Sequence, residues 1–374
     1  MLQNSGQTLL DHGWRISPSN ELTPCPATPL ASSVENHTLH SPALSSTMEK
    51  RKIGGLPIDP SGDTGQHDRN SQSPETSSST DLWSDWLLRR RFGDDPLNEA
   101  TVRRAVERIR DRVLDGAQLS PDMVLIDVGS GDGLIAFGAF QRVGPTMQAT
   151  FVDLSEPLLR CAEESAKKLG LRDQCSFVQA SADRLDGILD SSANSLTTRA
   201  VLAYVQDKGA AARQFYRVLK PGGRLSIAEP IFRDDALQLA AFTAQLLSRP
   251  DSSERARLIQ RFRALQWPSQ MSEIQSNPLT NFTERDLVSI FLGIGFKEIH
   301  LELHIDVRKA TPVPWNTYID SAPRPGAPTL REIFSTHFSL AERRLIEDAL
   351  RTLVESGNLT NRETIAYLVA DKPL

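Results

Sequence analysis

The sequence predicts an α/β fold in which helices cover both faces of a parallel sheet. Residues 124–128 form an apolar run that leads into a turn with three alternating glycines, and a helical pattern starts at residue 134. Two more apolar strands, at residues 149–153 and 176–180, follow with a helix between them. Alternating strands and helices are typical of an open parallel sheet, which binds ligands at the carboxyl ends of its strands.

The turn after the first expected strand contains Gly129, Gly131 and Gly133. Because glycine has no Cβ, such a turn permits unusual backbone angles and lets a ligand approach the backbone closely. A dinucleotide-binding fingerprint requires a glycine or alanine where this chain has Leu134, which disfavours a dehydrogenase. A glycine turn that binds nothing is the structural alternative.

An acid ends the second expected strand, 24 residues after Gly129. At the end of this strand, Asp153 is positioned to accept hydrogen bonds from the ribose hydroxyls of a nucleoside-containing ligand. The alternative is an acid that only interacts with the dipole of the next helix, whose apolar positions run from Leu158 to Leu169. The spacing from the glycine turn favours the ribose role.

The remaining strands follow the same pattern. Residues 195–198 form the fourth strand, and a helix with apolar positions from Ala211 to Leu219 comes after it. The Lys-Pro-Gly-Gly tetrapeptide at 220–223 is expected to end that helix and turn the chain into a fifth strand, residues 224–229. Two later strands, expected at 298–307 and 364–370, bring the total to seven.

These motifs together resemble class I S-adenosylmethionine (SAM) dependent methyltransferases of the small-molecule type, including the ubiquinone/menaquinone biosynthesis enzymes. The resemblance covers about residues 95–235 and rests on the Asp-x-Gly-x-Gly-x-Gly motif, the acid at 153 and Leu-Lys-Pro-Gly-Gly at 219–223. It implies a Rossmann-like seven-stranded sheet with helices on both faces, and SAM as the cofactor. The residues that it places around SAM are Asp127, Gly129, Ser130, Gly131, Gly133, Asp153, Leu154, Ser181, Ala182, Asp183 and Arg199.

In the resembling family, the turn after the third strand holds adenine, often through an Asp followed by a small residue. This chain has Ser181 at the usual Asp position, Ala182 at the small one and Asp183 two residues after Ser181. A serine hydroxyl binds an exocyclic amine more weakly than a carboxylate does. Ser181 and Asp183 therefore both stay candidates for the adenine contact.

The resemblance also implies an enzyme that mainly aligns a nucleophile with the methyl group, helped by a general base where the nucleophile loses a proton. Glu229, at the end of the fifth strand, is the first candidate base, and a structural hydrogen bond to a loop amide is its alternative. Arg199 is expected to orient a substrate carboxylate or phosphate, or else to form a salt bridge. Tyr204 and His337 are further candidates.

No metal site is expected. Four potential ligands alternate along the sixth strand, but an edge strand with a polar outer face explains them: His300, Glu302, His304 and Asp306. Metal-dependent catechol-type methyltransferases have an Asp just after the fourth strand, where this chain has Arg199.

The chain is longer than a minimal domain of this kind. Residues 1–80, rich in Ser, Pro, Thr, Asn and Gln, are expected to be disordered, with Met1 and Met48 as alternative starts. A methyltransferase domain is expected over 81–374, with helical cap insertions at 236–280 and 311–358 that select the acceptor. Its N-terminal segment contains two tryptophans that are interpreted as packing anchors, Trp83 and Trp86.

Composition agrees with a cytoplasmic enzyme that acts on a small molecule. The 374 residues carry a net charge of −5, which disfavours a nucleic-acid substrate, and no apolar run is long enough to cross a membrane. The three cysteines (Cys25, Cys161, Cys175) form no Cys-x-x-Cys pair and indicate a reducing compartment. A protein or peptide methyltransferase and a catalytically silent SAM-binding module stay open as alternatives. The sequence carries no signal for the oligomeric state.

Overall fold

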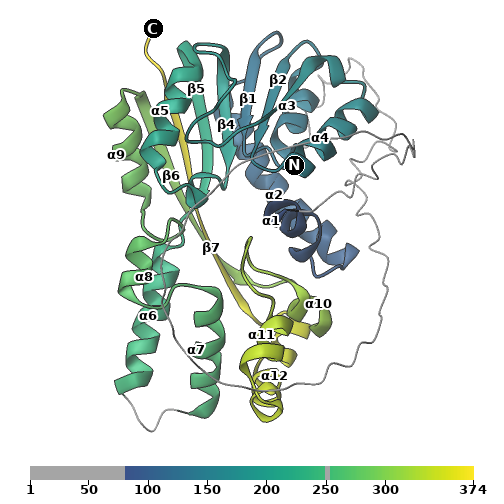
Figure 1. Cartoon of the computed structure of the whole chain (residues 1–374), viewed down its shortest axis with the longest axis vertical. Helices are drawn as coiled ribbons and strands as arrows, with labels where there is room; N and C mark the ends of the chain where they lie inside the picture. The colour runs from purple at the N-terminus through teal and green to yellow at the C-terminus, as the bar shows by residue number, and fades with distance from the viewer. Residues whose placement is uncertain (1–80, 249–252) are drawn as a thin grey trace, which may run out of the picture. The chain divides into compact units, whose positions relative to one another are not determined.

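Residues 81–248 and 253–374 are described by the structure, a computed structural model. The expected disorder of residues 1–80, the alternative start at Met48 and the cysteine at 25 lie outside these ranges. Within them the chain forms a seven-stranded sheet covered by helices on both faces (Figure 1), which confirms the predicted fold class. No helix in the two ranges has the length and apolarity needed to span a membrane.

The strand order in the sheet is β3-β2-β1-β4-β5-β7-β6. Strands β1 to β5 are parallel, whereas β7 runs antiparallel to both of its neighbours, β5 and β6. The strands are β1 (Val124–Val128), β2 (Gln148–Asp153), β3 (Cys175–Gln179), β4 (Ala193–Arg199), β5 (Leu219–Pro230), β6 (Lys297–Lys309) and β7 (Thr360–Asp371).

One predicted boundary is wrong. Leu219 was assigned to the helix before the Lys-Pro-Gly-Gly turn, but it begins β5 and pairs with Ala193 on β4. The pairing then resumes between Arg224 and Ser195, so residues 220–223 form an irregularity within the strand pair. The preceding helix α5 (Lys208–Val218) ends one residue earlier than its apolar pattern suggests.

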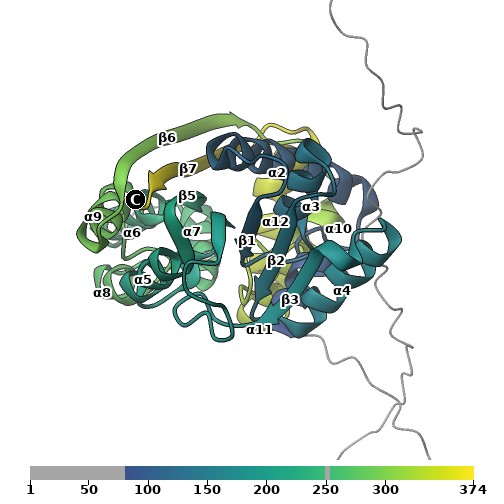
Figure 2. The same ribbon diagram turned by 90° about the horizontal axis from the view of Figure 1, so that it is seen from above.

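The helices that cover the sheet lie on two faces. Figure 2 shows α2 (Pro96–Ala117), α3 (Leu134–Val143) and α4 (Glu156–Lys168) on one side, and α5 and α9 (Glu284–Ile294) on the other. The expected capping box at the start of α9 is present, because the side chains of Thr283 and Asp286 each accept a bond from the other's backbone N–H. A short 3₁₀ turn, η2 (Arg172–Gln174), leads into β3.

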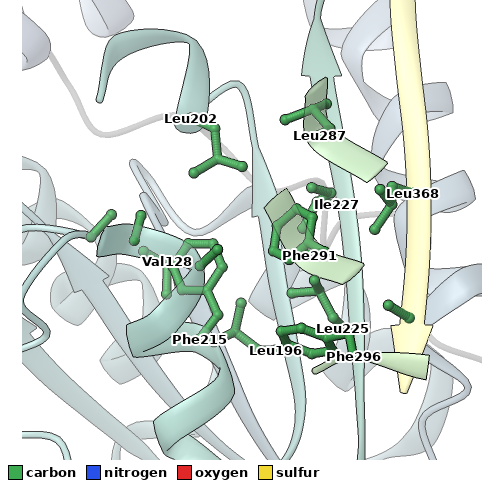
Figure 3. Close-up of a cluster of buried hydrophobic side chains, with 14 of the residues drawn as sticks. Val128, Leu196, Leu202, Phe215, Leu225, Ile227, Leu287, Phe291, Phe296 and Leu368 are labelled. Atoms are coloured by element: carbon green, nitrogen blue, oxygen red, sulfur yellow. The ribbon is translucent and has the colours of Figure 1, made fainter. Parts of the chain in front are cut away.

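The core on the α5 and α9 side is built from aromatic and branched aliphatic side chains. Phe215 of α5, Phe291 of α9 and Phe296 are fully buried against Leu225 and Ile227 of β5 (Figure 3). The rings of Phe291 and Phe296 meet edge to face with centres 5.5 Å apart, a favoured aromatic geometry. This packing holds β5 rigidly beside the parallel strands.

Six further helices form what we call the helical cap. They come from two separate chain segments: α6 (Arg233–Ser248), α7 (Glu254–Gln266) and α8 (Met271–Ser276), then α10 (Trp315–Asp320), α11 (Leu330–His337) and α12 (Leu340–Glu355). Apolar residues of α7, α10, α11 and α12 pack into one cluster separate from the sheet core, including Phe262, Trp315, Ile333 and Ile346. The two segments therefore stabilise each other.

Replacing Phe291 by Ala should lower the free energy of unfolding by about 3–5 kcal/mol, because it removes a fully buried ring and leaves a cavity. The adjacent Leu292 is 56% exposed, so Leu292→Ala is the matched control and should cost less than about 1 kcal/mol. Urea unfolding of both variants measures the difference. Equal losses would contradict the packing described for α9.

Candidate functional site

A cavity of about 270 Å³ lies at the carboxyl ends of β1, β2 and β4. Its floor comes from the glycine turn after β1, the end of β2 and the turn after β3, and one side comes from residues 199–206. The opposite wall, which we call the roof, consists of two short segments, residues 82–90 and 322–325. Residues 82–90 contain helix α1 (Leu82–Asp85) and the π-helical turn η1 (Trp86–Arg90).

The roof segments are joined across 236 positions of the sequence. The indole Nε1 of Trp86 donates to the carbonyl of Ala322 at 3.0 Å, and the backbone N–H of Ala322 donates to the carbonyl of Arg90 at 2.8 Å. Trp83, Trp86 and Pro325 line the cavity. The tryptophans, which the sequence suggested as packing anchors, therefore also form the cavity wall.

The three glycines of the turn differ in what they contact. Gly129 and Gly131 have positive φ angles of 66° and 57°, a region that side chains rarely adopt. A Cβ on Gly129 would lie 2.2 Å from a methyl of Val201, so this glycine is required by packing, while one on Gly131 would lie 3.0 Å from Leu87 of the roof. Gly133 does not line the cavity and caps α3 instead.

Ser130 lines the cavity, and its Oγ is buried without a hydrogen-bond partner in the described part of the chain. A buried hydroxyl without a partner is costly, so a ligand group beside it would satisfy an unmet bond. The glycine turn thus offers polar contacts as well as close backbone approach.

Asp127 is almost fully buried at the end of β1 and lines the cavity. Its carboxylate accepts hydrogen bonds from Thr197 Oγ1 at 2.9 Å and from the backbone N–H of Ala136 at 3.3 Å. Burial raises the pKa of Asp127 to about 7. The carboxylate therefore links β1 to β4 and to the start of α3.

Asp153 connects the two turns that form the cavity floor. One oxygen accepts from the backbone N–H of Gly131 at 2.8 Å and the other from that of Ser155, in the turn before α4, at 2.9 Å. Burial raises the pKa of this carboxyl as well. Each carboxylate oxygen has more than one acceptor position, so these bonds leave capacity for a ligand hydroxyl. The two predicted roles of Asp153 are thus compatible.

The turn after β3 brings its two polar candidates into contact. Ser181 Oγ donates to the carboxylate of Asp183, and both residues line the cavity together with Ala182 and Leu154. Because the serine proton is used in this bond, Asp183 keeps the stronger acceptor positions. The pair is therefore better regarded as one polar group than as two alternatives.

Glu229 is fully buried and does not line the cavity. Its carboxylate accepts from the backbone N–H groups of Val201 and Ala203 at 3.0 and 3.1 Å, and from Thr198 Oγ1 at 3.2 Å. Burial raises its pKa. This geometry matches the structural alternative, a bond to loop amides, and makes Glu229 a support for the loop after β4 rather than a base within reach of a ligand.

Arg199 and Tyr204 both line the cavity. Arg199 forms no salt bridge with any residue in the described ranges, so the alternative of an intramolecular ion pair is not realised there. The ring of Tyr204, in the 3₁₀ turn η3 (Leu202–Tyr204), meets that of Trp83 edge to face at 5.1 Å. Burial raises the pKa of Tyr204 to about 12, so its hydroxyl is a donor at neutral pH.

The other candidates lie elsewhere. His337 is exposed at the end of α11 and does not line the cavity. On the edge strand β6, Glu302 pairs with Arg112 and lies 3.4 and 3.2 Å from the ring nitrogens of His300 and His304. Glu302 thus contacts an arginine and two histidines at the edge of the sheet.

Residues 119–273 match the protein family described as "Methyltransferase domain". The ubiquinone/menaquinone biosynthesis C-methyltransferase UbiE of Escherichia coli is 30% identical over 139 residues, which is 36% of this chain and 55% of the relative. The match thus spans about half of the curated relative's length.

Two solved structures have lower similarity. YcgJ of Bacillus subtilis gives a TM-score of 0.45 at 16% identity, over 71% of this chain and 98% of its own. Phosphoethanolamine N-methyltransferase 2 of Haemonchus contortus, solved with S-adenosyl-L-methionine, gives 0.42 at 17% identity, over 78% and 56%.

The raised pKa of Asp127 predicts a pH dependence of stability. The Asp127 carboxyl binds a proton more tightly in the folded chain, with a pKa of about 7, than in the unfolded chain, where its pKa is about 4. Protonation therefore stabilises the folded state fully below about pH 4, and this stabilisation is lost as the pH rises through about 7. Between pH 4 and 7 the free energy of unfolding should therefore fall by about 3 kcal/mol more in the wild type than in Asp127→Asn. Urea titrations at several pH values measure it; parallel curves would contradict a raised pKa.

Glu229→Gln tests the support of the loop after β4. The amide keeps only one acceptor oxygen for two backbone N–H donors, so we expect a loss of about 1–3 kcal/mol in the free energy of unfolding. Glu355→Gln, at the exposed end of α12, is the control and should change stability by less than about 0.5 kcal/mol. An unaltered stability with a lost methyl-transfer rate would instead restore the general-base role.

Proposed function

We propose that the chain, whose residues 119–273 match the methyltransferase-domain family, is a class I SAM-dependent enzyme that transfers the methyl group of SAM to an O, N or C nucleophile of a small molecule. The observation that carries the proposal is the cavity at the carboxyl ends of β1, β2 and β4. Its lining brings the glycine turn, Asp153 and the 181–183 turn together with Arg199 and Tyr204.

The residues around the floor fit SAM. The hydroxyl of Ser130 lacks a partner, and Asp153 and Asp183 have spare acceptor positions that suit ribose hydroxyls and an exocyclic amine. We propose that these residues hold the nucleoside, with Leu154 and Ala182 against its rings. Asp127 acts indirectly, because it is only 1% exposed, against 9% for Asp153, and it holds β4 and the start of α3.

When bound, SAM supplies a methyl group on a positively charged sulfur, which is an electrophile. The chain's own contribution is then to orient the acceptor, exclude water and hold the developing charges. The roof tryptophans cover the cavity, and Tyr204 presents a protonated hydroxyl that can donate a hydrogen bond to the acceptor. With Glu229 engaged by the loop, residues 199–206 contribute no carboxylate to the cavity lining beside Tyr204, which favours an acceptor that needs little help in losing its proton.

The alternatives are separated by turnover and acceptor size. A silent SAM-binding module would bind SAM without converting it to S-adenosylhomocysteine in the presence of any acceptor. A protein or peptide methyltransferase would label macromolecules in an extract with radioactive SAM and leave the small-molecule fraction unlabelled. We expect the label in the small-molecule fraction.

Calorimetric titration tests the cofactor directly. The wild type should bind SAM and S-adenosylhomocysteine, and Gly131→Val should weaken both by at least about 10-fold, because the side chain crowds the turn beneath Leu87. Gly170→Val is the matched control, since Gly170 also has a positive φ of 68° but has open space around it and lies outside the cavity. Failure of the wild type to bind either nucleoside would refute the proposal.

A further inference from the structure

Three arginines lie at the cavity or beside residues that line it, and Arg199 is the one whose side chain is part of the lining. Arg199 lines the cavity at the end of β4. The guanidinium of Arg91 lies 5.0 Å from the ring centre of Trp86, and Arg324 directly precedes Pro325; both Trp86 and Pro325 line the cavity. Within the described ranges, none of the three arginines forms a salt bridge.

Two neighbouring arginines of the N-terminal segment are paired, unlike these three. Arg90 binds Glu332 at 2.6 Å, and Arg103 contacts both Glu99 and Asp132. Arg324 donates only to two backbone carbonyls, and its buried Nε has no partner among the described residues. A guanidinium partly withdrawn from water without an opposite charge is costly, so the fold retains a site that an anion would stabilise.

Two of the three charges, those of Arg199 and Arg91, act on each other. Burial and the positive charge of Arg199 lower the pKa of Arg91 to about 9, and burial lowers the pKa of Arg324. All three lie close enough to Tyr204 to influence its ionisation. A single anion among them would relieve both the repulsion and the loss of hydration.

We propose that Arg199, Arg91 and Arg324 form an anion subsite for a carboxylate or phosphate group of the methyl acceptor. This inference rests on the proposed function, because it names the chemical class of that enzyme's acceptor. Arginine suits the task, since its planar donors match the geometry of both anions.

The amino-acid carboxylate of SAM is the other possible source of an anion here. SAM also carries an ammonium and a sulfonium group, however, so its binding adds net positive charge. The acids proposed to contact the nucleoside, Asp153 and Asp183, lie on the floor formed by β2 and the turn after β3. Arg199 lies at the end of β4, Arg324 lies in the roof, and Arg91 directly follows the first roof segment. The division of charge across the cavity assigns the anion to the acceptor.

The remaining walls of this subsite describe the rest of the acceptor. Trp83, Trp86, Tyr204 and Pro325 line the same cavity as Arg199 and present flat, largely apolar surfaces to it. Such surfaces favour planar apolar groups. The acceptor class is therefore a small planar acid, such as an aromatic carboxylate or an aryl phosphate.

Probe binding to the full chain saturated with S-adenosylhomocysteine tests the subsite. Phenyl phosphate and benzoate are expected to bind, and benzamide, which has the shape of benzoate but no charge, should bind at least about 10-fold more weakly. Arg199→Gln and Arg91→Gln should each weaken phenyl phosphate binding by about 10- to 100-fold. Arg89→Gln is the control, because Arg89 lies in the same turn but pairs with Asp85 and should leave the affinity unchanged.

The outcomes separate the possible explanations. Equal binding of benzoate and benzamide, or no binding of any probe, would overturn the subsite. Arginine variants that lose S-adenosylhomocysteine affinity while keeping their affinity for phenyl phosphate would assign these residues to the cofactor carboxylate and would also overturn the subsite.

If the wild type binds no nucleoside, the proposed function fails. Titration of phenyl phosphate into the chain alone then still decides whether the subsite exists. Arg199→Lys, which keeps the charge but not the paired donors, substitutes for any Gln variant that does not fold, and it should also weaken phenyl phosphate.

Discussion

The site depends on carboxylates that are buried at the carboxyl ends of the strands and accept backbone N–H groups. Asp127 holds the start of α3, Asp153 holds the glycine turn and the start of α4, and Glu229 holds the loop after β4. Each bond fixes the position of a segment that would otherwise depend only on the geometry of its own turn. Burying these acids is costly, which is why the pKa of all three is raised. The cavity exists because these bonds keep its floor and one side in place.

The sheet could be predicted from the sequence because its signals are local. Each parallel strand is a short apolar run, and the acids at 127, 153 and 229 mark where strands end. The same pattern does not reveal how an acid is used. Glu229 looks like an available base in the sequence, yet its acceptor positions are taken by a loop 26 to 31 residues earlier in the chain. Only the folded backbone shows which lone pairs remain.

The contacts that the sequence does not show are those between distant segments. Trp86 and Ala322 meet across 236 positions, and α7 shares a core with α10, α11 and α12. No periodicity relates such partners, so the sequence does not place Arg91 and Arg324 near the cavity that Arg199 lines. The tryptophans at the start of the domain were the available signal, because large aromatic side chains near a ligand cavity often serve as its wall.

The roof is made of two short segments, residues 82–90 and 322–325, that lie far from the strands in the sequence. The residues proposed to hold the cofactor lie on the strand ends and their turns, and these are fixed by the buried carboxylates independently of the roof. Substitutions in the roof can therefore accumulate without disturbing the nucleoside side of the cavity. Over evolutionary time, descendants of one ancestral gene could acquire new acceptors through changes in these two segments while inheriting the same methyl donor.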